Sequence, residues 1–526
     1  MCRERHARIT PRVDVRCTVQ TMSESLSATP MGVDITKRQL YMVFAGVISG
    51  LALSALDATI VNTALVTIVG ELGGIKYYAW VGTAYMLTST TSTPLFGKLS
   101  DLYGRRRLFQ AAIIIFAVGS LLCGTAQSMW QLVVARGVQG VGGGGLMAVA
   151  FAIIGDVVAP RERGKYMGLI TSIFTFSSVV GPLIGGFIVD NTSWRWIFLV
   201  NIPVAAVAIA ITNKALRLPF TRQQRKVDFL GATLLVLAVT TLLLGLSWTG
   251  DEYGWLSAPT LGFFAAAIVG TVAFVRWEAV APEPIIPLPM LRIDTVRVVV
   301  PLMILIGAVF YGANAFMPLF LQGVTGVSAT NSGLLLVPMA VSVAITATWV
   351  GRVTSRTGTY KMWSPIGCGI TAVGFVMASF LDSSHGYLYL AMSASFTLGV
   401  GMGMIMPTGT LAVQNAVAPS EMGTASSVVV FMRQLGGAVG LAAYGALFAT
   451  QLNGRIDPKL VQAPRMIKKL PSPTREQALD ALTHAIVVVF RGAVPLIAIA
   501  FVVALAMPNR PLRSAESMMS GRPSDH

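Results

Sequence analysis

Long apolar runs alternate with short polar turns along the chain from about residue 40 onward. Each run approaches the length of about 20 residues that an α-helix needs to cross the hydrocarbon core of a bilayer. Hydropathy predicts about fourteen transmembrane helices, at residues 40–64, 78–97, 108–124, 130–154, 166–189, 195–213, 229–248, 258–276, 298–320, 331–351, 361–381, 387–409, 424–449 and 485–506. The pattern therefore predicts an all-α integral membrane protein, with both termini on one side because the number of spans is even.

The charges of the turns predict which side that is. Lysines and arginines gather in alternate turns and beside them, at positions 98, 105–107, 161, 163, 165, 214, 217, 222, 225, 226, 292, 297, 352, 356 and 361. Basic loops stay in the cytoplasm under the positive-inside rule, so we place both termini there. The stretch 450–484, which this topology puts outside, is also basic and runs against the rule.

Composition agrees with a membrane protein and excludes several other classes. The chain is 54% hydrophobic and 12% charged, whereas soluble domains are about 25% charged. The net charge of +16 lies mostly in short loops, where topology and anionic lipid explain it better than a nucleic-acid partner. Cysteines and histidines lack metal-site spacing, so we expect no metal. The phosphate-binding loop of ATP-driven pumps is absent, and we expect neither a cofactor nor enzyme activity.

The spans predict two six-helix bundles separated by two extra helices and a proline-rich connector. We divide the chain into a polar N-terminal tail, a first bundle, a linker with the extra helices, a second bundle and a cytoplasmic C-terminal tail, at 1–37, 38–213, 214–297, 298–506 and 507–526. The second bundle includes an extracellular loop at 450–484. The N-terminal tail lacks the apolar core of a signal peptide, and Met22 or Met31 is an alternative start.

Two polar turns in corresponding places indicate that the bundles are repeats. The first, at residues 97–107, combines two glycines, one acid and four bases. In the second, Gly351 and Gly358 repeat the spacing of Gly97 and Gly104, with Ser355 in place of the acid Asp101. Internal repeats of this kind are typical of secondary transporters.

Embedded charges are the strongest candidates for chemistry. Asp57 lies in the first span and Arg136 in the fourth, each about 10 Å or more below the outer end of its helix. An ionised acid there must pair, face water or take up a proton, so we predict an ion pair or a shared proton site. A structural acid satisfied by neighbouring hydroxyls is the alternative. Arg433 in the thirteenth span is a further embedded base.

Glycines follow Arg136 and recur in the fifth span. Gly140, Gly142 and Gly145 match a dinucleotide fingerprint formally, but no strand precedes them, and close helix packing is the better interpretation. In the fifth span, small residues surround a proline, at Gly168, Gly181, Pro182, Gly185 and Gly186. This pattern predicts a kinked, tightly packed helix at the seam between the bundles, although a generic membrane kink would look the same.

Together these stretches resemble the major facilitator superfamily, and the span count points to its fourteen-helix drug:proton antiporter branch. The first turn matches at Gly97, Leu99, Asp101, Gly104, Arg105 and Arg106. Spans 1, 4 and 5 match at Leu56, Asp57, Thr59, Ile60, Val61, Asn62, Ala64, Arg136, Gly137, Gln139, Gly140, Gly142, Gly168, Gly181, Pro182, Gly185 and Gly186. The stretches 194–203 and 433–437 also resemble this branch, whereas Val66 and Ser177 replace its usual proline and glycine.

The resemblance implies two bundles that rock about a central cavity and exchange protons for small lipophilic compounds. It implies that Asp101 caps the helix that begins near Thr424, and that Arg105 pairs with Asp156. These contacts would latch the outward-open state, with Gly97, Gly104 and Arg106 also in the gate. Asp57, Arg136 and Arg433 are then the residues expected to serve proton coupling or transport.

The sequence therefore predicts a proton-coupled antiporter that exports amphiphilic compounds or drugs from the cell. We expect a multi-pass monomer of the plasma membrane that uses the proton gradient and confers antibiotic resistance. Because the predicted spans contain few acidic residues, we expect neutral, zwitterionic or anionic substrates. The candidate residues for the cavity lining are Asn62, Gln139, Tyr311, Asn314, Phe316, Gln322 and Gln434. The alternatives are a dedicated exporter of one metabolite, such as an amino acid, siderophore or lipid, and a membrane sensor without flux.

Overall fold

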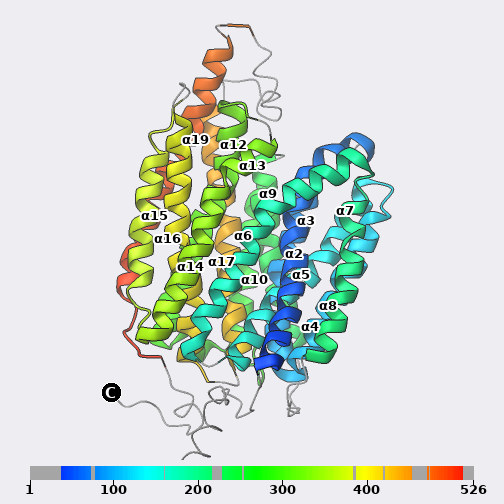
Figure 1. Ribbon diagram of the computed structural model, residues 1–526, viewed down its shortest axis with the longest axis vertical. Coiled ribbons are helices and arrows are strands. Elements are labelled where there is room, and N and C mark those ends of the chain that lie inside the picture. The colour runs from blue at the N-terminus through cyan, green and yellow to red at the C-terminus, as the bar shows by residue number, and fades with distance from the viewer. Residues whose placement is uncertain are drawn as a thin grey trace, which may run out of the picture.

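The computed structural model describes residues 37–512, apart from gaps at 73–77, 159, 216–227, 252–253, 328, 383–386, 419–420, 453–470 and 473. Its regular elements, within those residues, are all helical. The first group is α2 (Lys37–Leu72), α3 (Tyr78–Tyr103), α4 (Arg105–Gly124), α5 (Met129–Val157), α6 (Pro160–Asn191), α7 (Trp196–Leu199) and α8 (Asn201–Ala215). These helices form the right-hand bundle in Figure 1.

The second bundle occupies the left-hand part of the same view (Figure 1). It contains α12 (Asp294–Leu319), the π-helix η2 (Phe320–Val324), α13 (Ala329–Leu335), α14 (Val337–Thr357), α15 (Trp363–Ala378), α16 (Tyr387–Ala416), α17 (Met422–Leu452) and α19 (Thr474–Leu505). The two bundles meet where α6 packs along α14 and where α17 packs against α3 and α5. Each pair therefore joins the two halves of the sequence.

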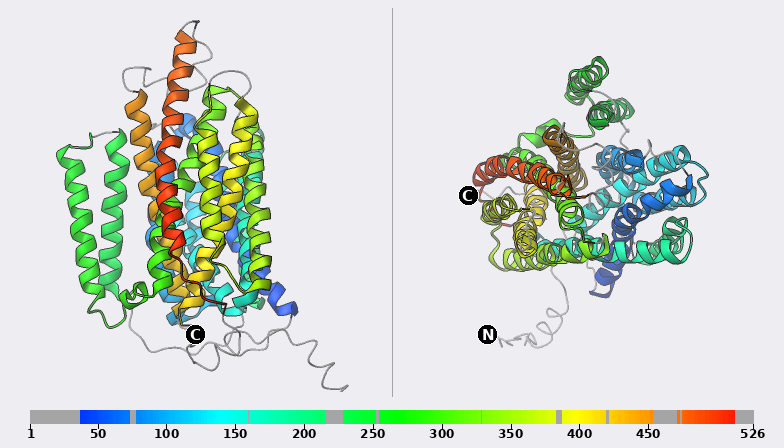
Figure 2. Two further views of the ribbon diagram at one scale, coloured as in Figure 1. Left: turned by 90° about the vertical axis from the view of Figure 1, so that its left-hand side faces the viewer. Right: turned by 90° about the horizontal axis from the view of Figure 1, so that it is seen from above.

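A hairpin of α9 (Phe229–Asp251) and α10 (Ala258–Glu278) stands beside the two bundles, as both views in Figure 2 show. At its foot the Trp277 indole donates to Asp228 at 2.8 Å. The buried Glu278 carboxylate accepts the backbone N–H groups of Ile285 and Ile286, at 3.2 and 3.1 Å. These bonds fix the connector, which continues through α11 (Leu288–Leu291) into α12.

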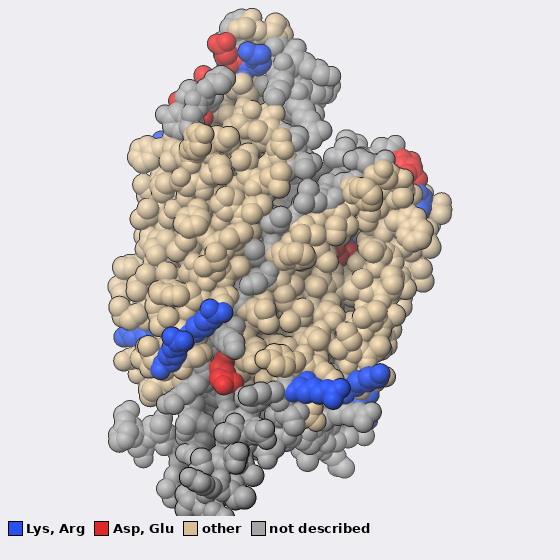
Figure 3. Space-filling view, in the orientation of Figure 1, with Lys and Arg blue, Asp and Glu red and all other residues tan. Residues whose placement is uncertain are grey.

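Eleven helices of the described residues are long and apolar enough to cross a membrane. Helix α15, with 16 residues, is a shorter apolar helix. Helix α3 falls outside this set because residues 88–93 are all serine or threonine. Many side chains of α6 lie outside the description, so the set does not cover that helix. Figure 3 shows that most charged side chains on one face lie toward the two ends of the helices, with a mainly uncharged band between them.

The helix bounds correct several predicted boundaries. Helix α19 begins at Thr474, so the last span starts earlier than predicted and part of the expected loop 450–484 is helical. Its added turns are amphipathic, with Ala478 and Leu482 buried, and a hydropathy window does not detect such a pattern. The predicted spans 195–213 and 331–351 are each interrupted, between α7 and α8 and between α13 and α14. The polar tail 1–36 lies outside the described residues.

Glycines in the first bundle allow a sharp turn between two helices and close contact between helix backbones. Gly104 separates α3 from α4 with a φ of 94°, a conformation that only glycine adopts readily. In α5 a Cβ on Gly144 would lie 2.9 Å from the carbonyl carbon of Ser89 on α3. A Cβ on Gly142 would lie 2.5 Å from the backbone nitrogen of Phe116 on α4. Small residues therefore let three helix backbones approach closely, as predicted for this stretch.

Replacing Gly144 with alanine tests this packing. We expect Gly144→Ala to lower the midpoint of thermal unfolding in detergent, because overpacking of this kind costs about 1–3 kcal/mol. Gly445→Ala in α17 is the matched control, since a Cβ there would meet nothing within 4 Å. Equal midpoints for the two variants would contradict the close approach of α3 and α5.

Candidate functional site

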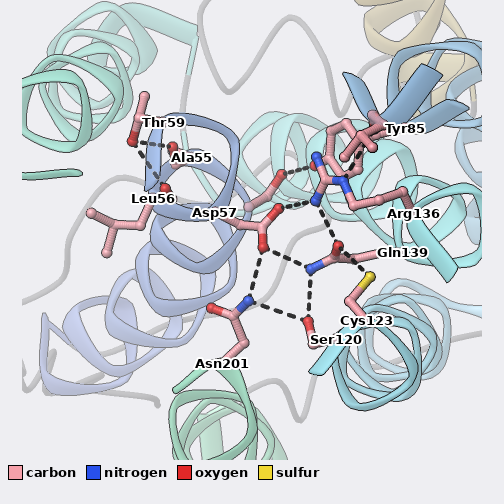
Figure 4. A network of polar contacts seen from close by, with 12 residues as sticks. Ala55, Leu56, Asp57, Thr59, Tyr85, Ser120, Cys123, Arg136, Gln139 and Asn201 are labelled. Atoms are coloured by element: carbon pink, nitrogen blue, oxygen red, sulfur yellow. Dashed lines mark hydrogen bonds and ion pairs between the residues drawn. The ribbon is translucent and has the colours of Figure 1, made fainter. Parts of the chain in front are cut away.

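A buried ion pair lies inside the first bundle. Asp57 on α2 and Arg136 on α5 face each other, with 2.5 Å between the carboxylate Oδ2 and the guanidinium Nη1 (Figure 4). Asp57 is fully buried and Arg136 is 3% exposed. The ion pair predicted from the depth of the two residues is thus present.

Uncharged groups complete this network (Figure 4). The Gln139 amide donates to Asp57 Oδ1 at 2.8 Å and accepts from Arg136 at 2.6 Å. Asn201, the first residue of α8, donates to the same Oδ1 at 3.0 Å. Ser120 on α4 accepts from both amides, at 2.7 and 3.2 Å. Asp57 is therefore held by a cation and two amides, and not by hydroxyls as in the structural alternative.

A third helix supports Arg136 from the other side. Its Nε donates to the Val81 carbonyl on α3 at 3.3 Å, and its guanidinium lies 4.3 Å from the centre of the Tyr85 ring. The Tyr85 hydroxyl lies 2.9 Å from Ser54 Oγ on α2. Such contacts offset part of the desolvation cost of the charge.

The network contains residues that sequence reasoning missed. Asn201 belongs to the stretch 194–203 that matched the family, but nothing in that match assigned it a partner. Ser120 and Tyr85 carried no signal, because serines and tyrosines are common and their contacts arise only when α3, α4 and α5 pack together. Gln139, predicted to line the cavity, is instead fully buried among Asp57, Arg136 and Ser120.

A second polar cluster joins the bundles at the opposite end of α3. The Asp101 carboxylate accepts from the backbone N–H and the hydroxyl of Thr424, at 3.0 and 2.8 Å. Thr424 lies in the first turn of α17, where the helix dipole favours an anion. Arg105 pairs with Asp101 and, through Nε at 2.6 Å, with Asp156 at the end of α5. Both contacts implied by the resemblance are present, whereas their gating role stays a prediction.

Neighbouring groups extend this contact between the bundles. Gln414 of α16 donates to the Phe151 carbonyl of α5 at 3.2 Å, and the buried Arg163 of α6 reaches Met422 Sδ at 3.5 Å. Gly97 lies against α17, where a Cβ would be 3.1 Å from the Gly423 carbonyl oxygen. Arg106 bonds Asn213 of its own bundle, and its gating role stays a prediction.

Comparison with known proteins agrees with this arrangement. The model of the Major Facilitator Superfamily matches residues 47–441. The chain belongs to this superfamily. It is therefore a multi-pass membrane transporter and not an enzyme.

Relatives within the superfamily cover most of the chain. The multidrug transporter protein MdtP of Bacillus subtilis is 38% identical over 423 residues, which span 80% of this chain and 77% of that protein. Multidrug resistance protein 3 of the same organism is 32% identical over 498 residues, or 90% of this chain and 96% of that protein. The crystal structure of the human organic anion transporter MFSD10 matches 88% of this chain and 99% of its own, with a TM-score of 0.62 and 16% identity. The last likeness shows the major facilitator fold alone.

The packing motif of this major facilitator chain places α6 against α2. A Cβ on Gly181 would lie 2.7 Å from Thr59 Cβ, and one on Gly185 would lie 3.1 Å from the Ile60 carbonyl oxygen. The Thr59 hydroxyl donates to the Ser177 carbonyl at 2.9 Å. The side chains at positions 168, 182 and 186 lie outside the description, so the role of Gly168, Pro182 and Gly186 stays a prediction.

The remaining cavity candidates do not form one cluster. Phe316 is buried against Phe448, with 5.4 Å between the ring centres. Asn314 is exposed and donates to the Phe310 carbonyl of its own helix at 2.9 Å, and half-buried Gln322 reaches Ser332 at 3.4 Å. The side chain of Asn62 lies outside the description.

Arg433, Gln434 and Tyr311 do lie near the contact between the bundles. Gln434 of α17 is within 3.5 Å of Thr93 on α3, through Oε1 and the hydroxyl. Tyr311 of α12 is close enough to interact electrostatically with Arg433 and with Tyr85 of the first bundle. These side chains therefore connect the second bundle to the neighbourhood of the Asp57 network.

Proposed function

We propose that this transporter is a proton-coupled antiporter that exports small lipophilic or amphiphilic compounds by alternating access. In this proposal it works as a monomer in the plasma membrane and uses the proton gradient without a cofactor. The buried pair of Asp57 and Arg136 is the main support for this proposal. A carboxylate inside a membrane helix is energetically costly, and such residues usually have a function in transport or proton transfer. The names of the two bacterial relatives support export of drugs.

The chemistry of the network suggests how a proton would act. Protonation of Asp57 would remove one of two paired charges and leave Arg136 buried without its counter-ion. A buried charge that loses its partner is strongly destabilising. The network would then rearrange, and the first bundle would move relative to the second. Asn201 and Gln139, which bond the same carboxylate oxygen, would orient Asp57 for this exchange.

The second cluster supports an outward-open conformation. Asp101 with Thr424, and Gln414 with Phe151, hold the bundles together at one end. Under the proposed topology this end is cytoplasmic, because Lys98 and Arg105–Arg107 lie there. Helices α3, α6 and α15 would join the eleven apolar helices to give fourteen spans. The start of α2 and the end of α19 both lie at the lower end in Figure 1, as cytoplasmic termini require.

An efflux assay with an uncoupler tests the proposal. In an efflux-deficient bacterial host we expect the chain to lower the accumulation of several lipophilic dyes, and an uncoupler to restore accumulation to that of cells without the protein. Efflux that persists after the proton gradient has collapsed would contradict proton coupling. A spectrum limited to one metabolite would instead support a dedicated exporter, and absence of any efflux would support a membrane sensor.

A further inference from the structure

Arg433 is set firmly in the second bundle. The backbones of α12 and α17 touch beside it, since a Cβ on Gly307 would lie 2.9 Å from the Arg433 carbonyl carbon. Gly437, one turn further along α17, packs against the Tyr311 ring, and a Cβ there would lie 2.7 Å from Tyr311 Cε2. This close packing leaves the Arg433 backbone little freedom. The side chain is half-buried, and its neighbour Gln434 faces the first bundle.

The guanidinium of half-buried Arg433 differs from those of the three buried arginines in the described residues. Arg136 pairs with Asp57, Arg105 pairs with Asp101 and Asp156, and Arg163 donates to backbone carbonyls. Within the described part of the chain, by contrast, Arg433 has no acidic partner and no hydrogen bond. An unpaired charge at this depth is costly and marks a substrate or ion pathway by default.

The charges around the centre of the molecule do not cancel. Asp57 is already matched by Arg136, so it offers no free negative charge to a cationic substrate. Adding Arg433 to this pair leaves one uncompensated positive charge when Asp57 is ionised. The Tyr311 ring packs against Gly437, one turn from Arg433, and offers an apolar surface there. The surroundings therefore suit a molecule with one acidic group and an apolar body.

We propose that Arg433, assisted by Tyr311, binds the acidic head group of the exported compound, and that the substrates are anionic amphiphiles. The inference rests on the proposed export function and narrows its substrate class. A guanidinium presents a planar set of donors that matches a carboxylate or sulfonate, and the Tyr311 hydroxyl adds one more donor. The unpaired charge of Arg433 would thus be satisfied by the substrate and not by the protein.

Equilibrium binding to the purified full-length protein tests this site without any proton gradient. The probes are a dansylamino fatty acid, its methyl ester and the corresponding dansyl alkylamine, followed by fluorescence titration in detergent. We expect the acid to bind most tightly. Arg433→Gln should weaken binding of the acid about tenfold or more and leave the ester unchanged, because a hydrogen-bonded charge pair is lost. Arg433→Lys should keep part of the preference for the acid.

Arg491→Gln is the matched control. Arg491 lies in α19 of the same bundle, where its exposed side chain donates to the Ser379 carbonyl at 3.3 Å, and its loss should leave all three affinities unchanged. Three results would overturn the inference: equal affinities of wild type for acid and ester, tighter binding of the amine, or equal weakening of all three probes in Arg433→Gln. If Arg433→Gln does not fold, the affinities of the wild type for the three probes and those of Arg433→Lys test the inference.

Transport in vesicles separates this inference from the proposed function. An anion that leaves and a proton that enters both carry positive charge inward. We therefore expect a negative-inside membrane potential to accelerate export of the acid more than export of the ester. Preference for the acid with no response to a proton gradient would count against proton coupling alone. Proton-driven export of the amine, with no preference for the acid, would count against the anion site alone.

Discussion

Asp57→Asn is expected to abolish uphill export while downhill exchange of substrate continues. The amide is nearly isosteric with the carboxylate, and its one oxygen can still accept from Gln139 and Asn201. Its NH2 group cannot accept from Arg136, and the side chain can carry neither a proton nor a charge. Proteoliposomes with and without an imposed proton gradient separate the two activities. Asp57→Glu, which restores a titratable group, is expected to recover part of the gradient-driven transport.

Asp57→Asn should also lower the stability of the folded protein, and a second substitution at Arg136 tests the cause. Asparagine leaves Arg136 buried without its counter-ion, although the guanidinium keeps its bonds to Gln139 and Val81. Loss of one partner from a buried pair costs about 3–5 kcal/mol. The double variant Asp57→Asn/Arg136→Gln removes both charges and should regain most of the lost stability, measured by thermal unfolding in detergent. Uphill transport should remain absent in it.

This pair of measurements separates a proton-coupling role from a structural one. If Asp57 serves only to hold the bundle together, the double variant should regain transport as it regains stability. Uphill, pH-dependent transport in Asp57→Asn itself would rule out the residue as the coupling site. Asn201→Ala, which removes one bond to Oδ1, should shift the pH dependence of transport and leave the ion pair in place.

Helix positions were largely predictable because membrane helices have a simple apolar pattern. The predicted spans 108–124, 130–154 and 258–276 differ by at most three residues at either end from α4, α5 and α10. The pattern failed where apolar and polar residues alternate on one helix, as at the start of α19. It also failed at breaks inside an apolar run, as between α13 and α14, because hydropathy does not report a local interruption of the regular helix.

The site was predictable only for its charges. Depth along two helices identified Asp57 and Arg136 as partners, because an embedded charge has few ways to be satisfied. Ser120 and Asn201 are ordinary polar residues whose importance comes from three helices converging on one carboxylate. The contact of Asp101 with Thr424 joins residues 323 positions apart, and only the family resemblance pointed to it. No periodicity within a single helix contains such information.

Asp101→Asn is expected to shift the transporter toward the inward-open state without unfolding it. One carboxylate oxygen accepts two bonds from Thr424 at the start of α17, and the residue also pairs with Arg105. A charge at a helix terminus contributes about 0.3–1 kcal/mol when exposed and up to about 2 kcal/mol when partly buried. Its loss should change a balanced two-state equilibrium by about two- to thirtyfold.

Cysteine labelling measures this shift on both sides of the membrane. The protein used for labelling has Cys2 and Cys17 replaced with serine. Cys123 and Cys368 can stay, because both are buried. Ser427→Cys reports the inner end, since Ser427 is buried opposite Gly97 in the contact between the bundles. Asn62→Cys reports the outer side under the proposed topology. Asp101→Asn should accelerate labelling at position 427 and slow it at position 62.

The corresponding position of the second turn provides the control. Ser355 carries no charge, and its hydroxyl donates to the Gly351 carbonyl of its own helix at 2.8 Å. Ser355→Ala should therefore leave both labelling rates unchanged. Thr424→Val, which removes one of the two bonds to Asp101, should act in the same direction as Asp101→Asn but less strongly. If Asp101→Asn reduces transport while both labelling rates stay at wild-type values, Asp101 does not latch the bundles and acts on transport by another route.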